Sequence, residues 1–221
     1  MNECPRSRRP TRNRLLLYYI TDRSQFSGDE KTRQRTLLAK IAEATLCGID
    51  LIQLREKDLS ARELEALARA AVGVVRENSR GRTRLLVNSR VDIAIACGAE
   101  GVHLRSDDIL PSDVRRIESH PGALLTSVSC HSVPEVARAA SEAADFAVFA
   151  PVFEKQNAAQ AKLAGLDGLR EACRLKISVL ALGGITLSNA RACVDVGAAG
   201  IAAIRLFQDN DIADVVRQLK S

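Results

Sequence analysis

Short apolar segments alternate along the chain with longer segments of helical periodicity. The apolar segments are rich in Val, Ile and Leu and have the length of buried strands. The segments between them, such as 61–77 and 133–143, repeat apolar residues with the spacing of amphipathic helices. Strands are predicted at residues 15–20, 50–54, 84–87, 101–104, 123–128, 145–149, 177–182 and 199–204. This alternation indicates a parallel sheet with right-handed crossover connections.

Eight strand–helix units in about 200 residues are close to the smallest (β/α)8 barrel. Gly48, Gly98 and Gly197 follow predicted helices, where a left-handed residue ends a helix. The competing doubly wound sheet carries a Gly-rich turn after its first strand, and here that turn reads Thr-Asp-Arg-Ser at 21–24. We therefore predict an α/β protein with a single-domain (β/α)8 TIM barrel over residues 15–221 and no internal linker.

The composition narrows the class of protein. The 221 residues are 46% hydrophobic and 27% charged, as in ordinary globular proteins. No apolar run approaches the ~20 residues that span a bilayer, so we expect no membrane partner. Aromatic residues make up only 3%, which argues against a base-stacking surface for nucleic acid. The six cysteines form no Cys-x-x-Cys pair, which is typical of a reducing cytoplasm.

The positive charge is concentrated at the start of the chain. The net charge is +5, and residues 1–14 contain five Arg and one Glu, so the rest of the chain is nearly neutral. Pro5 and Pro10 discourage regular structure there. The simplest interpretation is a disordered basic N-terminal arm, and an arm that binds a polyanion is the alternative.

The second predicted strand carries the first candidate site. Ile52 and Leu54 share one face, whereas Gln53, Arg55 and Lys57 share the other. In a barrel the chemistry lies at the carboxyl ends of the strands, and unpaired buried cations are costly. The alternation favours an anion-binding site. The alternative is a strand that stops at Leu54, with the charges solvated.

Oxygen ligands follow the next two strands. Asn88 ends the third strand, and Asp107 and Asp108 follow the fourth. Mg²⁺ prefers such ligands together with substrate phosphate oxygens, so Asn88 and Asp108 are candidate metal ligands. The aspartates could equally cap a helix ahead of Pro111.

The fifth strand ends near Ser129 and His131. His131 is placed at the mouth of the barrel, and imidazole suits general acid–base work near neutral pH. Ser129 is a candidate for positioning substrate. His103 could face the barrel interior, or it could be a core residue whose hydrogen bonds are satisfied within the protein.

The last two strands end in small residues. Backbone amides after the seventh and eighth strands form the phosphate cup of many such barrels, and glycines let a ligand approach the main chain. The predicted cup residues are Gly183, Gly184, Ala203 and Ile204.

From residue 15 onward, motifs in this order and spacing resemble the thiamine phosphate synthase/TenI superfamily. The similar segments are 19–23 (Tyr-Ile-Thr-Asp-Arg), 53–58 (Gln-Leu-Arg-Glu-Lys-Asp), 101–104 (Gly-Val-His-Leu), 128–132 (Val-Ser-Cys-His-Ser), 150–153 (Ala-Pro-Val-Phe) and 183–186 (Gly-Gly-Ile-Thr). The resemblance implies a (β/α)8 enzyme that acts on small phosphorylated thiazole and pyrimidine substrates. A homodimer is an open alternative to a monomer.

Two chemistries follow from the resemblance. The synthase joins hydroxymethylpyrimidine diphosphate to thiazole phosphate and expels pyrophosphate with Mg²⁺. Gln53, Arg55 and Lys57 would then hold the pyrimidine diphosphate, with the two cations acting on the leaving group. The TenI-like tautomerase aromatises a thiazole carboxylate phosphate without a metal, and His131 would shuttle the proton.

Several positions depart from the synthase pattern. Ser89 replaces an Asp that would be a second metal ligand, and residues 155–158 (Lys-Gln-Asn-Ala) replace a Thr-x-Thr-Lys diphosphate clamp. Arg105 and Arg205 replace small residues, and together with Lys155 and Lys162 they are candidate sources of replacement charge. The synthase is the leading prediction. The tautomerase and a barrel that binds thiazole phosphate without turnover are the alternatives.

Overall fold

In the computed structural model of the chain, the described residues are 14–79, 81–117, 124–154 and 164–220. The strands are β1 (Leu16–Ile20), β2 (Leu51–Leu54), β3 (Arg84–Asn88), β4 (Gly101–Leu104), β5 (Leu125–Cys130), β6 (Phe146–Phe149), β7 (Ser178–Leu182) and β8 (Gly200–Ala203). The helices are the short 3-10 turn η1 (Arg23–Gln25), α1 (Glu30–Leu46), α2 (Ala61–Ser79), α3 (Val91–Cys97), α4 (Pro111–Ile117), α5 (Val133–Ser141), α6 (Gly165–Cys173), α7 (Ala190–Asp195), α8 (Arg205–Gln208) and α9 (Ile212–Lys220).

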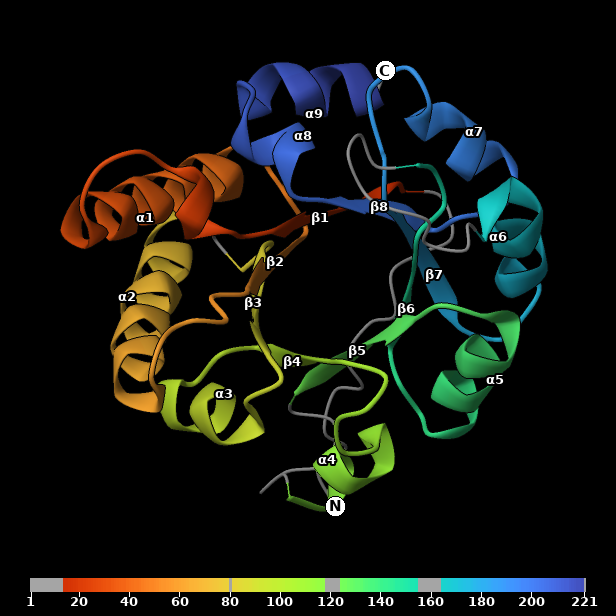
Figure 1. Cartoon of the computed structure of the whole chain (residues 1–221), viewed down its shortest axis with the longest axis horizontal. Helices are drawn as coiled ribbons and strands as arrows, with labels where there is room; N and C mark the ends of the chain where they lie inside the picture. Colours follow the sequence, from red (N-terminus) through yellow and green to blue (C-terminus); the bar gives the residue numbers. More distant parts are fainter. Residues whose placement is uncertain (1–13, 80, 118–123, 155–163, 221) are drawn as a thin grey trace, which may run out of the picture.

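The strands form a closed parallel barrel in sequence order, with β8 paired to β1. The helices surround the ring, with α1 to α3 on one side, α5 to α7 on the other, and α8 beside α9 (Figure 1). The predicted (β/α)8 fold is confirmed. The fifth strand runs two residues further than predicted, because Ser129 and Cys130 continue the ladder with Val148 and Phe149. Of the predicted basic arm only Arg14 is described, and it pairs with Asp50 at 2.9 Å.

Alternation along the strands divides the core in two. On β1, Leu16, Tyr18 and Ile20 point into the barrel and join an interior cluster. Leu17 and Tyr19 belong to the larger cluster between the strands and the helices. Both layers are apolar because each face of a parallel barrel strand is covered, which explains the nearly continuous hydrophobic runs in the sequence.

Three helix-to-strand connections contain the same type of hydrogen bond at the amino ends of the strands. An acidic side chain just before a strand accepts the first free amide of the preceding strand. The pairs are Asp50 with Leu17 N (3.0 Å), Glu100 with Leu85 N (2.9 Å) and Asp145 with Thr126 N (2.8 Å). These bonds satisfy buried backbone donors at the end of the barrel that is opposite the predicted site.

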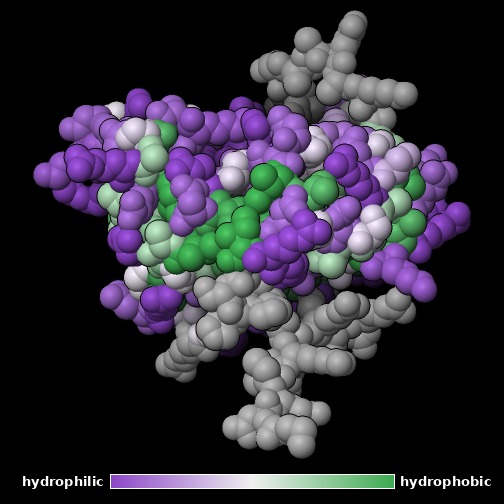
Figure 2. All heavy atoms as spheres, turned by 90° about the horizontal axis from the view of Figure 1, so that it is seen from below, coloured by the Kyte–Doolittle hydropathy of each residue, from purple (hydrophilic) through white to green (hydrophobic). Residues whose placement is uncertain are grey.

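Polar side chains frame an apolar area on the face that carries α3 and α4 (Figure 2). Ile95, Ile109 and Ile117 are exposed large hydrophobic residues of this part of the chain. Among the described residues no helix is both long and apolar enough to cross a membrane.

Closure of the barrel depends on Gly200, where β8 meets β1. A Cβ atom there would lie against the carbonyl oxygen of Leu16 and 2.7 Å from its Cβ. We predict that Gly200→Ala lowers the free energy of unfolding by about 3 kcal/mol, because the backbones of β1 and β8 would have to separate. Urea denaturation measures this change.

Gly73 on α2 is the matched control, because a Cβ there meets nothing within 4 Å. Gly73→Ala should raise the free energy of unfolding by roughly 0.5–1 kcal/mol, since alanine favours the helix interior. Equal effects of the two substitutions would contradict the closure argument.

Candidate active site

A cavity of about 990 Å³ opens at the carboxyl ends of the strands. Among the described residues, its lining contains four basic side chains and two acidic ones, so it is suited to an anionic ligand. The cavity brings together all the predicted site residues except Asp108: Gln53, Arg55, Lys57, Asn88, Ser129, His131, Gly183, Gly184, Ala203 and Ile204.

The end of β2 is held by buried hydrogen bonds to the end of β1. Thr21 Oγ1 accepts the amide of Arg55 at 3.0 Å and donates to Glu56 Oε1 at 2.5 Å. Glu56 Oε2 accepts the amide of Arg23 at 3.0 Å and its Nη1 at 3.1 Å. Glu56 points outward to Arg23, whereas the neighbouring Arg55 and Lys57 line the cavity.

Arg23 continues this network toward the surface. It pairs with both oxygens of Asp58, at 2.7 and 2.8 Å, and with Glu30 at 2.7 Å. Burial raises the pKa of Glu56, against the lowering effect of its bonds from Thr21 and Arg23. Arg23 holds the pKa of the Asp58 carboxyl below its usual value. The sequence analysis did not single out Thr21, Arg23 or Glu56 as site residues, although Glu56 alternates with the residues that it did identify.

A chain of polar side chains crosses the barrel interior beneath the cavity. The Tyr18 hydroxyl oxygen lies 3.3 Å from Ser127 Oγ, and Ser127 Oγ lies 2.7 Å from His103 Nδ1. On the other side of the imidazole ring, His103 Nε2 lies 2.9 Å from Ser129 Oγ. Burial, with a smaller effect of Arg55, lowers the pKa of His103 to about 3. His103 therefore faces the interior, lines the cavity and is neutral at physiological pH.

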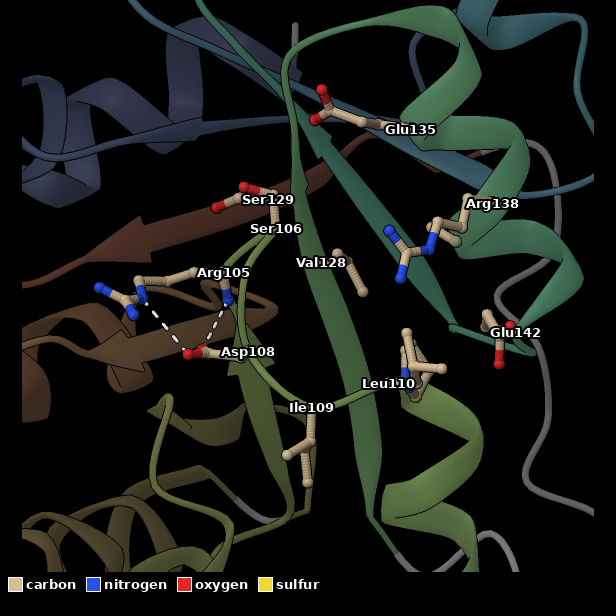
Figure 3. A pocket seen from close by; sticks show the side chains of 12 residues that line it. Arg105, Ser106, Asp108, Ile109, Leu110, Val128, Ser129, Glu135, Arg138 and Glu142 are labelled. Carbon is tan, nitrogen blue, oxygen red and sulfur yellow. Dashed lines mark hydrogen bonds and ion pairs between the residues drawn. The ribbon is translucent and has the colours of Figure 1, made fainter.

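The predicted metal ligands line two adjoining pockets, which share Arg105 and Ser129 in their linings. Asn88 Oδ1 accepts from Gln53 Nε2 at 2.8 Å, and Asn88 Nδ2 donates to Ser89 Oγ at 3.0 Å. Asp108 instead lines a neighbouring pocket of about 40 Å³, between the β4–α4 loop and α5, and it bonds to Arg105 (Figure 3). The described residues contain no group of three or more His, Cys, Asp or Glu side chains suited to a metal.

The paired glycines have a packing role that the sequence analysis did not predict. Gly183 and Gly184 have φ values of 100° and 63°. A Cβ on Gly184 would lie 2.5 Å from the carbonyl oxygen of Glu154, and one on Gly183 would lie 2.9 Å from Pro151 Cα. The glycines therefore allow the segment after β6 to pack against the end of β7, in addition to lining the cavity.

His131 lies at the rim of the cavity. Its Nδ1 is 2.9 Å from the carbonyl oxygen of Ala150, which can only accept, so Nδ1 carries a proton. The amide of His131 donates to Glu135 at 2.7 Å. In the neutral ring Nε2 then has a lone pair, as a proton acceptor requires. Residues 155–158, which replace the diphosphate clamp, and Lys162 lie outside the described residues.

The burial of His103 predicts that the free energy of unfolding depends on pH. Below the ordinary pKa of 6.5 an unfolded chain protonates His103, whereas the folded protein keeps it neutral until about pH 3. The free energy of unfolding should therefore fall as the pH drops below 6.5, by up to ~1.4 kcal/mol per pH unit from this residue. Urea denaturation across this range should give a shallower pH dependence for His103→Gln. Parallel curves for the two proteins would contradict the assignment.

Comparisons with known proteins give the family. A family model described as thiamine monophosphate synthase matches residues 17–207. A relative from Geobacter sulfurreducens, provisionally named a thiamine-phosphate synthase, is 42% identical over 92% of each chain. The thiamine-phosphate synthase of Methanoculleus marisnigri is 36% identical over 92% of this chain and 93% of its own.

A solved structure agrees with these relatives. Thiamine phosphate pyrophosphorylase from Pyrococcus furiosus superposes with a TM-score of 0.77 at 30% identity, over 94% of this chain and 95% of its own. These relatives support the leading prediction, a synthase-like enzyme, and the resemblance inferred from the motifs is confirmed. The chain belongs to the thiamine monophosphate synthase family.

Proposed function

We propose that this protein joins hydroxymethylpyrimidine diphosphate to thiazole phosphate, which gives thiamine phosphate and pyrophosphate. The names of its relatives support this reaction. The observation that carries the proposal is the convergence of Arg55 and Lys57 with Gly184 in one cavity of about 990 Å³. That cavity offers a cationic end for a diphosphate and a main-chain end for a second phosphate.

Arg55 and Lys57 would act on the leaving group. As the bond between the pyrimidine methylene carbon and the diphosphate oxygen breaks, negative charge accumulates on pyrophosphate and positive charge on the pyrimidine. Fixed cations stabilise the developing negative charge most effectively when they are preorganised. The bond that the Arg55 amide donates to Thr21 Oγ1 provides that preorganisation, because it fixes the backbone from which the guanidinium extends.

The pyrimidine, on which positive charge accumulates, requires surroundings without a further positive charge. His103 is neutral at physiological pH because burial lowers its pKa to about 3, so it adds no charge that would repel a pyrimidine cation. It orients the Ser129 hydroxyl at 2.9 Å from its Nε2. Gln53 is buried, and its Oε1 has no hydrogen-bond partner among the described residues, so a donor on the bound substrate would satisfy it.

The thiazole phosphate is assigned to the ends of β7 and β8. Gly183, Gly184, Ala203 and Ile204 line this part of the cavity. Among the described residues, the main-chain amide of Gly184 has no hydrogen-bond acceptor, so it can donate to a phosphate oxygen. The thiazole nitrogen would then form the new bond to the pyrimidine methylene carbon.

Mg²⁺ belongs to the proposal as a cofactor. When bound, it would add positive charge to the departing diphosphate. Asn88, at the end of β3, and Asp108, in the loop after β4, would supply oxygen ligands of the type that Mg²⁺ prefers, and water and phosphate oxygens would fill the remaining positions. Ser89, beside Asn88, contributes a neutral hydroxyl in place of a second carboxylate. The cytoplasmic location and a homodimer stay predictions of the sequence.

One observation favours a second reaction, the metal-independent tautomerisation of a thiazole carboxylate phosphate. His131 lies at the same cavity with Nε2 available as a proton acceptor. In that case His131→Asn would be the most damaging substitution. Incubation of the protein with both thiamine precursors, with and without Mg²⁺, distinguishes the two reactions by their products.

We predict that Arg55→Ala lowers kcat/KM for pyrophosphate release by about 100-fold or more, because it removes a preorganised cation from the leaving group. Arg69→Ala is the control, since Arg69 pairs with Glu65 on the exposed surface of α2 at 2.7 Å. A coupled pyrophosphate assay measures both variants. Unchanged turnover in Arg55→Ala would refute the synthase assignment.

A further inference from the structure

Arg105 stands where the chain leaves β4, and its side chain is among those that line the cavity with Arg55, Lys57 and Asn88. Its side chain is 53% exposed. A guanidinium in this position can reach an anion in the cavity without first crossing a packed core. The neighbouring cations Arg55 and Lys57 are the ones assigned to the diphosphate.

The present partners of the Arg105 guanidinium are weakly held. Nε lies 3.3 Å from Asp108 Oδ1 and Nη2 lies 3.2 Å from Asp107 Oδ2, and the guanidinium forms no other hydrogen bond or ion pair with the described residues. The exposed pair with Asp107 contributes little to stability, and the bond to Asp108 is long for an ion pair with a carboxylate that is 14% exposed. The buried Arg23 is different, because it is held by bonds of 2.7 to 3.1 Å. Arg105 is therefore free to exchange partners.

The Asp108 carboxylate is bound through two separate oxygens. Oδ2 accepts the main-chain amide of Arg105 at 2.8 Å, and this bond closes the turn after β4. Within the part of the chain that the structure describes, Oδ1 bonds to the guanidinium alone. Figure 3 shows both bonds converging on Asp108, with Arg138 of α5 and Glu142, the residue after this helix, on the opposite side of the pocket. The guanidinium can leave while the turn keeps Asp108 in place.

We propose that Arg105 is a ligand of the diphosphate, and that in the free protein it instead neutralises Asp108, whose Oδ1 is released for a divalent cation when the diphosphate binds. This inference rests on the proposed function, which supplies the diphosphate. A guanidinium forms paired hydrogen bonds with phosphate oxygens, and a diphosphate carries more charge than one carboxylate. The released carboxylate then faces a cation without a competing internal partner.

The first arm of the test measures the binding of inorganic pyrophosphate by calorimetry in EDTA, so that no metal contributes. Arg105→Gln should weaken this affinity about tenfold, the effect of losing a charge-assisted hydrogen bond, and Arg105→Lys should restore part of it. Arg116→Gln is the matched control, because Arg116 forms a similar exposed pair with Asp113, at 2.9 Å, on α4. Equal affinities for wild type and Arg105→Gln would overturn the inference.

The second arm measures Mn²⁺ binding to the protein without substrate by electron paramagnetic resonance. Arg105→Gln should bind Mn²⁺ about tenfold more tightly than wild type, because its Asp108 is no longer paired. Adding Asp108→Asn to that variant should abolish the gain. An unchanged Mn²⁺ affinity in Arg105→Gln would overturn the competition between arginine and metal.

The experiments distinguish a failure of the proposed function from a failure of the role proposed for Arg105. Thiamine phosphate formation by the wild-type protein tests the proposed function alone. Wild-type synthesis together with unaltered pyrophosphate binding in Arg105→Gln refutes only the inference. Weakened pyrophosphate binding in that variant, without synthesis by the wild type, supports the anion site and refutes the reaction.

Discussion

The buried carboxylate of Glu56 determines the direction of the side chains that follow β2. It is fixed from one side by the Thr21 hydroxyl and from the other by Arg23. With Glu56 directed outward, its neighbours Arg55 and Lys57 line the cavity. The arrangement of cations at the mouth of the barrel therefore depends on contacts that lie outside the cavity and touch no substrate.

Charge is distributed unequally between the mouth of the barrel and its interior. The mouth carries Arg55, Lys57, Arg105 and Arg205, whereas the polar groups of the interior, around His103, are neutral. This separation suits a reaction whose two partners develop opposite charges. In the proposed reaction the cationic end would attract the leaving group, and the hydroxyl and imidazole groups beneath it would surround the pyrimidine without adding charge.

The sequence predicted the barrel well because each strand is covered on both faces, which leaves an unbroken apolar segment that is easily recognised. Period-two alternation also placed Gln53, Arg55 and Lys57 on one face of the second strand, and all three line the cavity, whereas their role in anion binding stays a prediction. Strand periodicity could not predict the contacts of Asp108. Whether its carboxylate binds a cation or the nearby Arg105 depends on the geometry of the loop after β4. The same holds for His103, whose partners Ser127 and Ser129 come from the next strand.

The packing of Gly183 and Gly184 against the segment after β6 has a consequence for how this site can change. The two glycines pack directly against Pro151, Phe153 and the carbonyl oxygen of Glu154, with no room for a side chain on either glycine. Any enlargement on one side must be absorbed by displacement on the other. A side chain added at Gly183 or Gly184 would therefore have to displace the segment after β6, so the shape of this wall of the cavity cannot change without a change in the position of that segment.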